Sequence, residues 1–301
     1  MELRVLRYFL AVVREQTVSA AAESLHLTQP TLSRQLRDLE DELGKKLFIR
    51  GSHRIELTEE GMLLRKRAEQ ILELVSRTES DISSYDETLS GDIHISAGET
   101  DAVKLIARAA NRMQQDYPLV HYHIYSGDGE DVLERLDKGL SDFGIVFTSI
   151  DDDRYNVVRI PMKDEWGILM RRDSPLAEKE SIALSDINSQ PLILSRQQSD
   201  KSDLIKWFGK KFDKLNIVST YNLVYNASVM VREHIGYALT LDKIINVSGD
   251  STLCFRPMNP PVYAEMHFIW NKYQIMTKSA AKFLEYFREE IAQYETEQAC
   301  Y

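Results

Sequence analysis

Between Gly61 and Gly91 the chain contains no glycine, and after Thr58 no proline occurs before Pro118. Glycine and proline are the residues that most often end a helix, so one uninterrupted helix can span most of this interval. Thr58 is a suitable N-cap, and two glutamates follow it where negative charge favours a helix N-terminus. The sequence therefore predicts a long helix over residues 59–90 that separates a small N-terminal segment from a larger remainder.

Apolar side chains recur along this predicted helix in steps of three and four residues. Such spacing, sustained over about three heptads, is typical of a seam that packs against a second helix. An ordinary core helix is the alternative, but charged residues make the other faces too polar for full burial. We expect the helix to pair with a second subunit through Leu64, Ala68, Ile71, Val75 and Ile82.

The first sixty residues contain three short helical patterns. Apolar residues recur at helical spacing from Leu3 to Val13, and an alanine-rich pattern follows at about residues 20–25. Thr28 is the predicted N-cap of a third helix, with Pro30 in its first turn, where the missing N–H of proline costs nothing. Three leucines of this helix share one face and are expected to pack inward, which leaves its polar side chains outside.

The outward face of the third helix has the composition of a major-groove reader, because amide, hydroxyl and guanidinium groups recognise base edges. A solvated helix face is the alternative that spacing alone leaves open. The candidate DNA-contacting residues are Gln29, Thr31, Ser33, Arg34 and Arg37. Beyond Gly44, alternating residues around a turn at 51–53 predict a small β-ribbon, with Arg50 and Arg54 near its tip and within reach of the sugar-phosphate backbone.

Residues 19–61 resemble the DNA-binding domain of LysR-type transcriptional regulators. They contain, in order, the elements AA-x-x-L, Q-P-x-x-S, L-E-x-x-L-G, L-F-x-R and L-T-x-x-G. The resemblance implies a winged helix-turn-helix over residues 1–58 and places Pro30 with the other candidates on the recognition helix. It also implies a linker and dimerisation helix over 59–90 and an effector-binding domain over 91–301.

What the resemblance implies about function is equally specific. The chain is expected to bind double-stranded promoter DNA as a homodimer or tetramer and to regulate transcription in response to a small-molecule co-inducer. Contacts with RNA polymerase are a further expectation. Two recognition helices must meet successive major grooves about 34 Å apart, and a dimer supplies that spacing.

Beyond Gly91, short β-type segments alternate with helical patterns, which predicts α/β architecture with parallel sheets. The resemblance to the LysR-type family extends here through weaker motifs and implies a two-lobed effector domain similar to type-2 periplasmic binding proteins. Lobe one is expected at 91–161 plus 265–301, and lobe two at 162–264. The fold class is therefore α/β, with an all-α winged helix-turn-helix domain and a long linker helix before it.

In open α/β sheets, ligands bind beyond the carboxyl ends of the strands. By the resemblance, the effector contacts map onto such positions: Gly98, Glu99, Thr100, Thr148, Ser195 and Arg196. An arginine that pairs with a carboxylate favours a small carboxylate as co-inducer. The carboxylate of Glu99 is an objection, since it would repel an anion unless it turned outward.

Other candidate sites are weaker. His121 and His123 would share a strand face, but no third ligand with metal spacing accompanies them, so packing at the strand is expected and no metal. Cys254 and Cys300 fit neither a disulfide framework nor a zinc-ligand spacing. No nucleophile and base are paired, so no catalytic residue is expected. The alternative function is a cytoplasmic small-molecule-binding protein or enzyme on the two-lobed fold.

The charge is unevenly distributed along the chain. The formal net charge of -10 taken alone argues against a protein whose whole surface binds nucleic acid. Residues 1–67 hold 12 Lys and Arg against 10 Asp and Glu, however, and residues 68–301 hold 25 against 37. DNA affinity is therefore expected to depend on a few placed arginines. The absence of an export signal or a long apolar run predicts a cytoplasmic protein without membrane contact.

Overall fold

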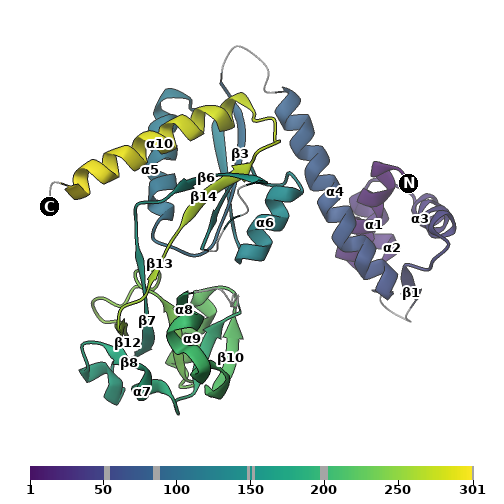
Figure 1. Ribbon diagram of the computed structural model, residues 1–301. Coiled ribbons are helices and arrows are strands. Elements are labelled where there is room, and N and C mark those ends of the chain that lie inside the picture. Colours follow the sequence, from purple (N-terminus) through teal and green to yellow (C-terminus); the bar gives the residue numbers. More distant parts are fainter. Residues whose placement is uncertain (51–54, 84–88, 148–149, 151–152, 197–202, 300–301) are drawn as a thin grey trace. The chain divides into compact units, whose positions relative to one another are not determined.

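The computed structural model describes residues 1–301 apart from 51–54, 84–88, 148–149, 151–152, 197–202 and 300–301 (Figure 1). The chain divides into two compact units, Met1–Ser83 and Ser84–Tyr301. Among the described helices, none combines the length and the apolar character that crossing a membrane requires.

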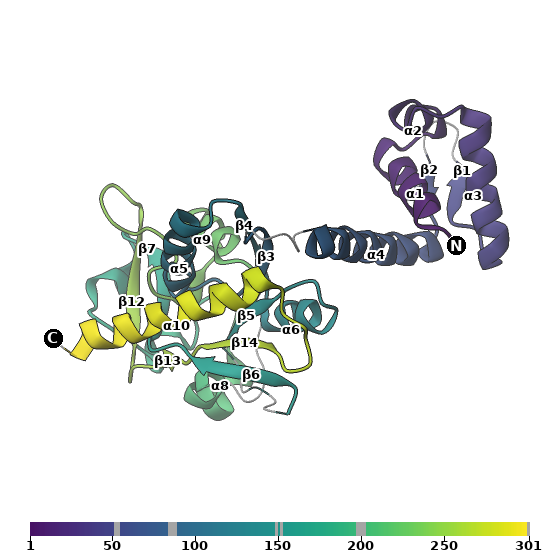
Figure 2. The ribbon, with the colours of Figure 1, turned by 90° about the horizontal axis from the view of Figure 1, so that it is seen from above.

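The N-terminal unit contains the three predicted helices and the predicted ribbon (Figure 2). Phe48 pairs with Leu57 and Arg50 with Ile55 in the antiparallel ribbon. One apolar core joins the helices, and Phe9 and Leu32 are its most buried large side chains. The elements are α1 (Leu3–Glu15), α2 (Val18–Ser24), α3 (Gln29–Leu43), β1 (Phe48–Arg50), β2 (Ile55–Leu57) and α4 (Glu59–Ser83).

Helix α4 begins as predicted. The Thr58 hydroxyl accepts a hydrogen bond from the Gly61 N–H at 2.9 Å and donates to the Lys46 carbonyl at 2.7 Å, so the cap also ties the helix to the strand before it. Gly61 makes this contact possible, because a Cβ there would lie 2.1 Å from the Leu47 carbonyl oxygen. The predicted continuation of the helix over 84–88 lies outside the described residues, and its predicted end at 89–90 was wrong, because Leu89 and Ser90 are not helical.

The predicted apolar seam of α4 is divided between two environments. Ala68 is fully buried in the core of its own unit, and Leu64 and Ile71 pack partly against the same core. Ile82 is 69% exposed, and Leu63 and Leu74, which lie off the predicted seam, are also exposed. The first half of the seam therefore packs within the chain, and the apolar side chains open to a partner are the seam residue Ile82 together with Leu63 and Leu74.

Lobe one of the second unit is built on a five-stranded sheet in the order β4-β3-β5-β14-β6. Helices α5 and α10 cover one face through an aromatic core that includes Phe143, Phe268 and Phe283, while α6 packs on the other face (Figure 1). Its elements are β3 (Gly91–Ala97), α5 (Val103–Asp116), β4 (Val120–Ser126), α6 (Gly129–Asp137), β5 (Phe143–Val146), β6 (Tyr155–Arg159), β14 (His267–Asn271) and α10 (Lys278–Ala299).

Lobe two is built on a second sheet in the order β10-β9-β11-β7-β12-β8, with β13 paired to β7. Its strands are β7 (Asp164–Arg171), β8 (Ile182–Ala183), β9 (Leu192–Ser195), β10 (Ile217–Tyr221), β11 (Tyr237–Leu241), β12 (Leu253–Asn259) and β13 (Tyr263–Ala264). Its helices are α7 (Leu184–Ile187), α8 (Asp203–Phe208) and α9 (Val224–Arg232), with 3-10 turns at Pro175–Glu178 and Gly209–Lys214.

The prediction of parallel sheets was right for only part of each sheet. Strand β3 runs parallel to β4 and β5, and β9 runs parallel to β10 and β11. Strands β14 and β7 are antiparallel to their main neighbours. The chain changes sheet between β6 and β7 and again between β13 and β14, so each sheet includes strands that arrive from the other lobe.

Candidate DNA-binding and effector sites

The candidate recognition helix, α3, begins at a well-formed cap. The Thr28 hydroxyl accepts a hydrogen bond from the Thr31 N–H at 3.4 Å and lies 2.8 Å from the Thr31 hydroxyl. Pro30 lies in the first turn, as its lack of an N–H favours. At the other end, Gly44 closes the helix in the left-handed conformation with a φ of 64°.

The burial pattern of α3 separates a core face from a polar face. Leu32, Leu36 and Leu39 are buried, whereas Arg34 is 83% exposed and has only a loose 4.0 Å ion pair with Asp38. The remaining candidates on the helix are exposed or half-buried: Gln29, Pro30, Thr31, Ser33 and Arg37. The polar start of the helix is therefore presented to solvent, as a base-reading surface requires.

A groove of about 380 Å³ runs beside this surface. Ser33, Arg37 and Glu40 line it from α3, and Lys46, Phe48 and Ile55 line it from the ribbon and the segment before it. A hydroxyl, a guanidinium and an ammonium that pairs with the Glu40 carboxylate thus lie around one concave surface of the N-terminal unit. Such groups donate hydrogen bonds to phosphate oxygens and to base edges.

Glu40 holds the ribbon against α3. Its carboxylate accepts hydrogen bonds from the backbone N–H groups of Leu47 at 2.8 Å and Phe48 at 3.4 Å, and it pairs with the Lys46 ammonium at 2.7 Å. Burial raises the pKa of this carboxyl, but the hydrogen bonds from Lys46 and the backbone outweigh burial and hold the pKa below its ordinary value. Glu40 is therefore ionised at neutral pH and fixes where the ribbon starts.

Three candidate residues lie partly or wholly outside the described structure. Arg50 is placed in β1, but its side chain is not described. Arg54, at the predicted tip of the ribbon, and Thr148, after β5, both lie outside the described residues. Their predicted contacts with DNA and with the effector stay predictions.

The effector candidates after β3 meet lobe two. Glu99 is half-buried, and its carboxylate accepts a hydrogen bond from the N–H of Val224, the first residue of α9. Burial raises the pKa of Glu99, against the lowering effect of the Val224 hydrogen bond. The first turn of a helix is where an anion binds best. The carboxylate of Glu99 therefore occupies the kind of position that an effector carboxylate would take.

Thr100 makes a second connection between the lobes. Its buried hydroxyl donates to Asp164 at the start of β7, at 2.5 Å, and accepts a hydrogen bond from the Ala102 N–H at 3.0 Å. Burial raises the pKa of Asp164, and the Thr100 hydrogen bond opposes that rise. Thr100 lies before α5, which begins at Val103, and its hydroxyl already has an acceptor and a donor as partners within the chain.

Gly98, just before these residues, is required by an aromatic contact. A Cβ at this position would lie 2.5 Å from the Phe147 ring. The glycine therefore lets the end of β3 pass directly beside the residue that follows β5.

Arg196 makes the third connection between the lobes. Its Nε and Nη2 atoms lie 2.9 and 2.8 Å from Asp128 Oδ2, and Nη2 lies 3.7 Å from Asp131 Oδ2. Asp128 is also the N-cap of α6, where it accepts a hydrogen bond from the Asp131 N–H at 3.0 Å. Ser195, half-buried at the end of β9, lies directly before the arginine. Glu99, Thr100 and Arg196 thus all contact the opposite lobe.

Sequence reasoning missed the partners of these residues. Asp128 stands in a Gly-Asp-Gly sequence that reads as a simple loop, yet it and Asp131 form a capping box, and the Asp-x-x-Asp spacing at the start of an amphipathic helix was the available signal. Asp164 and Val224 lie in lobe two, far along the chain, and no local pattern marks them as neighbours of Glu99 and Thr100.

Two family models match the chain. Residues 3–62 match the model described as bacterial regulatory helix-turn-helix protein, lysR family, and residues 86–292 match the model described as LysR substrate binding domain. The chain belongs to the LysR family. The two matches correspond to the winged helix-turn-helix with the start of α4 and to the two-lobed part of this LysR-family chain.

Named LysR-type relatives are moderately similar. A hydrogen peroxide-inducible genes activator of Pectobacterium carotovorum subsp. carotovorum is 30% identical over 195 residues, which span 64% of this chain and 64% of that protein. The HTH-type transcriptional regulator BsdA of Bacillus subtilis (strain 168) is 30% identical over 220 residues, 72% of this chain and 74% of that one. The match to the first relative therefore covers less than two thirds of its length.

Solved LysR-family structures share the fold over nearly the whole chain. The crystal structure of CbnR, a LysR family transcriptional regulator, has a TM-score of 0.72 at 19% identity and covers 97% of this chain and 99% of its own. Full-length CbnR complexed with its target DNA gives the same TM-score at 20% identity, over 96% of this chain and 100% of its own.

Proposed function

We propose that this LysR-family chain is a DNA-binding transcriptional regulator that responds to a small-molecule co-inducer. The observation that carries the proposal is the exposed polar start of α3, with Ser33 and Arg37 beside a groove and Arg34 open to solvent. Helix α3 enters the major groove, and the ribbon lies over the sugar-phosphate backbone. A protein that binds chromosomal DNA in this way works in the cytoplasm.

The protein acts as a homodimer or a tetramer of such chains. One recognition helix reads one half-site, and two half-sites about one helical turn apart require two copies of the helix. Helix α4 supplies the pairing surface, because Leu63, Leu74 and Ile82 are exposed apolar side chains on it. Exposed apolar side chains grouped on one element favour contact with a partner.

The co-inducer is a small carboxylate that binds where the two lobes meet. Its carboxylate replaces that of Glu99 at the N-terminus of α9 and pairs with Arg196, which turns away from Asp128. The Val224 N–H already donates to Glu99, and Arg196 already pairs with Asp128. The effector carboxylate therefore takes the place of these two carboxylates of the chain. A change in the relation of the lobes follows, because the contacts that are lost are contacts between lobes.

The peroxide response named for one relative is not carried over. Cys254 is buried, and burial raises the pKa of its thiol above the ordinary value. A thiol held protonated is a poor nucleophile towards peroxide. Cys300 lies outside the described residues. We propose no catalytic activity for the chain.

Selection of duplexes from random DNA by the full-length protein tests this function. The proposal expects an interrupted dyad whose half-sites are about 34 Å apart, bound with an affinity that falls as salt is raised. Recovery of no sequence preference would contradict it. A thermal-shift screen against small carboxylates tests the effector separately, since a ligand that binds only the folded state raises the melting temperature.

A further inference from the structure

Four polar side chains lie together on one face of the β3–β4 pair. The two strands are parallel, with Asp92 opposite His121 and His94 opposite His123. Because side chains alternate along a strand, these four residues share a face, while Ile93 between them is buried in the core of lobe one. The pairing of strands thus brings Asp92 and His94 beside the two histidines that the sequence left without a further ligand.

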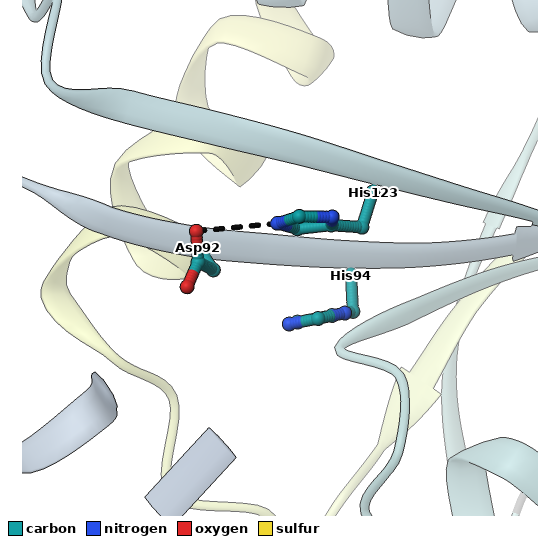
Figure 3. A group of neighbouring side chains, drawn as sticks. All are labelled: Asp92, His94 and His123. Carbon is teal, nitrogen blue, oxygen red and sulfur yellow. Dashed lines mark hydrogen bonds and ion pairs between the residues drawn. The ribbon is translucent and has the colours of Figure 1, made fainter. Parts of the chain in front are cut away.

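The side chains are close enough to act together (Figure 3). His123 Nε2 lies 3.2 Å from Asp92 Oδ1, and His121 Nδ1 lies 3.9 Å from the same oxygen. The rings of His94 and His123 are stacked, with centroids 4.6 Å apart and planes 15° from parallel. One ligand atom each from Asp92, His94 and His123 can be chosen so that all three lie within 4.8 Å of one another.

We propose that Asp92, His94 and His123 form a binding site for a divalent transition-metal ion of the zinc type, with His121 adjacent. Imidazole nitrogen and carboxylate oxygen are ordinary zinc ligands at about 2.0–2.2 Å. Ligand atoms around a tetrahedral ion lie about 3.3 Å apart, so small rotations of these side chains bring them to that spacing. Three protein ligands leave the fourth position to water or to His121.

The site is open to solvent, and its backbone is fixed. The side chains of His123 and His121 are 53% and 67% exposed, and that of Asp92 is 31% exposed, so an ion reaches them from solution. The backbone N–H of His94 donates to the carboxylate of buried Asp142 at 2.8 Å, and this hydrogen bond holds this part of β3 in place. An oxygen and two nitrogens on paired strands form a surface that favours zinc over magnesium or calcium, which prefer oxygen ligands alone.

A bound ion would join the first two strands of the second unit, Ser84–Tyr301, which we call the effector unit. Asp92 is the second residue of β3, the first strand of this unit, and His123 stands on β4, about thirty residues later. Metal binding at these residues would therefore stabilise the start of the unit against unfolding, because an ion that binds only the folded state shifts the folding equilibrium towards it.

The test uses the full-length, tag-free protein after removal of metal with a chelator. Calorimetric titration with Zn²⁺ is expected to give one ion per chain, and Co²⁺ is expected to give the visible absorption of a tetrahedral complex. Replacing His94→Gln and His123→Gln together should weaken Zn²⁺ binding at least about tenfold and remove both the Co²⁺ absorption and the rise in melting temperature with Zn²⁺.

His234→Asn is the matched control. His234 is an exposed histidine of lobe two in the left-handed conformation, with a φ of 63°, which asparagine tolerates. This variant should bind Zn²⁺ like the parent. The melting temperature without metal shows whether each variant is folded, and His123→Gln alone, at an exposed position, should already weaken binding. Unchanged Zn²⁺ affinity in the double variant, or an equal loss in His234→Asn, would overturn the proposal.

Discussion

Arg196 and Asp128 form an ion pair between the two lobes, with Arg196 Nη2 2.8 Å from Asp128 Oδ2. The same aspartate caps α6, so one carboxylate serves both a helix of lobe one and an arginine of lobe two. Arg196 is a candidate effector contact. The proposed effector contact and the observed contact between lobes therefore involve the same side chain.

Asp128→Ala should lower the stability of the effector unit by about 1–2 kcal/mol, the usual cost of losing an N-cap. Burial raises the pKa of Asp128, but hydrogen bonds from Asp131 and Arg196 outweigh burial and lower it overall. A carboxyl whose pKa falls on folding stabilises the folded state at pH values above the pKa that the group has in the unfolded chain. This stabilisation is lost as the pH falls through the pKa of the folded state.

Urea unfolding of the parent and of Asp128→Ala between pH 7 and pH 3 measures this effect. The difference between the two proteins should be full near pH 7 and should shrink below about pH 4, the ordinary pKa of an aspartate. Glu130→Ala, beside Asp128 in the first turn of α6, is the control. A difference that grows towards low pH would contradict the assignment.

Glu99→Gln should strengthen the binding of small carboxylates about tenfold or more. The amide oxygen of glutamine still accepts the hydrogen bond from Val224, but the substitution removes a negative charge from the N-terminus of α9. Burial raises the pKa of Glu99, so its ionised form costs stability as pH rises through that pKa, and the variant should be at least as stable as the parent at pH 7.

The measurement for Glu99→Gln is the dissociation constant of a carboxylate found in the thermal-shift screen. Glu180→Gln removes a carboxylate of the same size from an exposed position in lobe two and serves as the matched control. Weaker binding by Glu99→Gln than by this control would show that Glu99 assists the ligand and does not compete with it.

Gly61→Ala should destabilise the N-terminal unit by about 3 kcal/mol or more. The added Cβ would lie 2.1 Å from the Leu47 carbonyl oxygen, so α4 or the start of the ribbon must shift. Gly44→Ala is the comparison, because a Cβ there meets nothing within 4 Å and only the left-handed backbone is strained, at a cost of about 1–2 kcal/mol. Chemical denaturation should give the larger loss for Gly61→Ala, and equal losses would contradict the close contact.

Cys254→Ser should leave DNA binding unchanged in the presence of hydrogen peroxide. Its sulfur lies inside lobe two, 3.8 Å from the Arg171 carbonyl oxygen, and burial raises the pKa of the thiol. Labelling with an alkylating reagent should therefore be slow in the native protein and fast in the unfolded one. Loss of a peroxide response specifically in Cys254→Ser would show that this cysteine senses oxidant.

The sequence predicted the N-terminal unit in detail because its signals are local. The Thr28 cap, the inward leucines of α3 and the Thr58 cap each depend on residues within one or two helical turns, and the structure has them as expected. The apolar seam of α4 was predicted less well. Its periodicity shows that the residues share a face, but periodicity cannot distinguish the core of the same unit, where Ala68 packs, from a partner chain.

In the effector unit, the secondary structure was predicted better than the contacts of the candidate site. The alternation of strands and helices was predicted, but β6, β8, β12 and β13 were missed, and the antiparallel strands depend on pairings between distant parts of the chain. The same limit applied to the histidines. His121 and His123 are visible in sequence, whereas Asp92 and His94 become their neighbours only through the register of β3 against β4.

The affinity of the full-length protein for a duplex selected from random DNA tests the central claim most directly, measured for the parent and for Ser33→Ala with Arg34→Ala. We expect the double variant to bind at least about tenfold more weakly and to lose preference for the selected sequence, because each direct base contact contributes about 1–3 kcal/mol. Arg159→Ala, an exposed arginine of lobe one paired with Glu265, should bind like the parent. Equal affinity of the folded double variant and the parent would contradict the assignment of α3 as the DNA-reading helix.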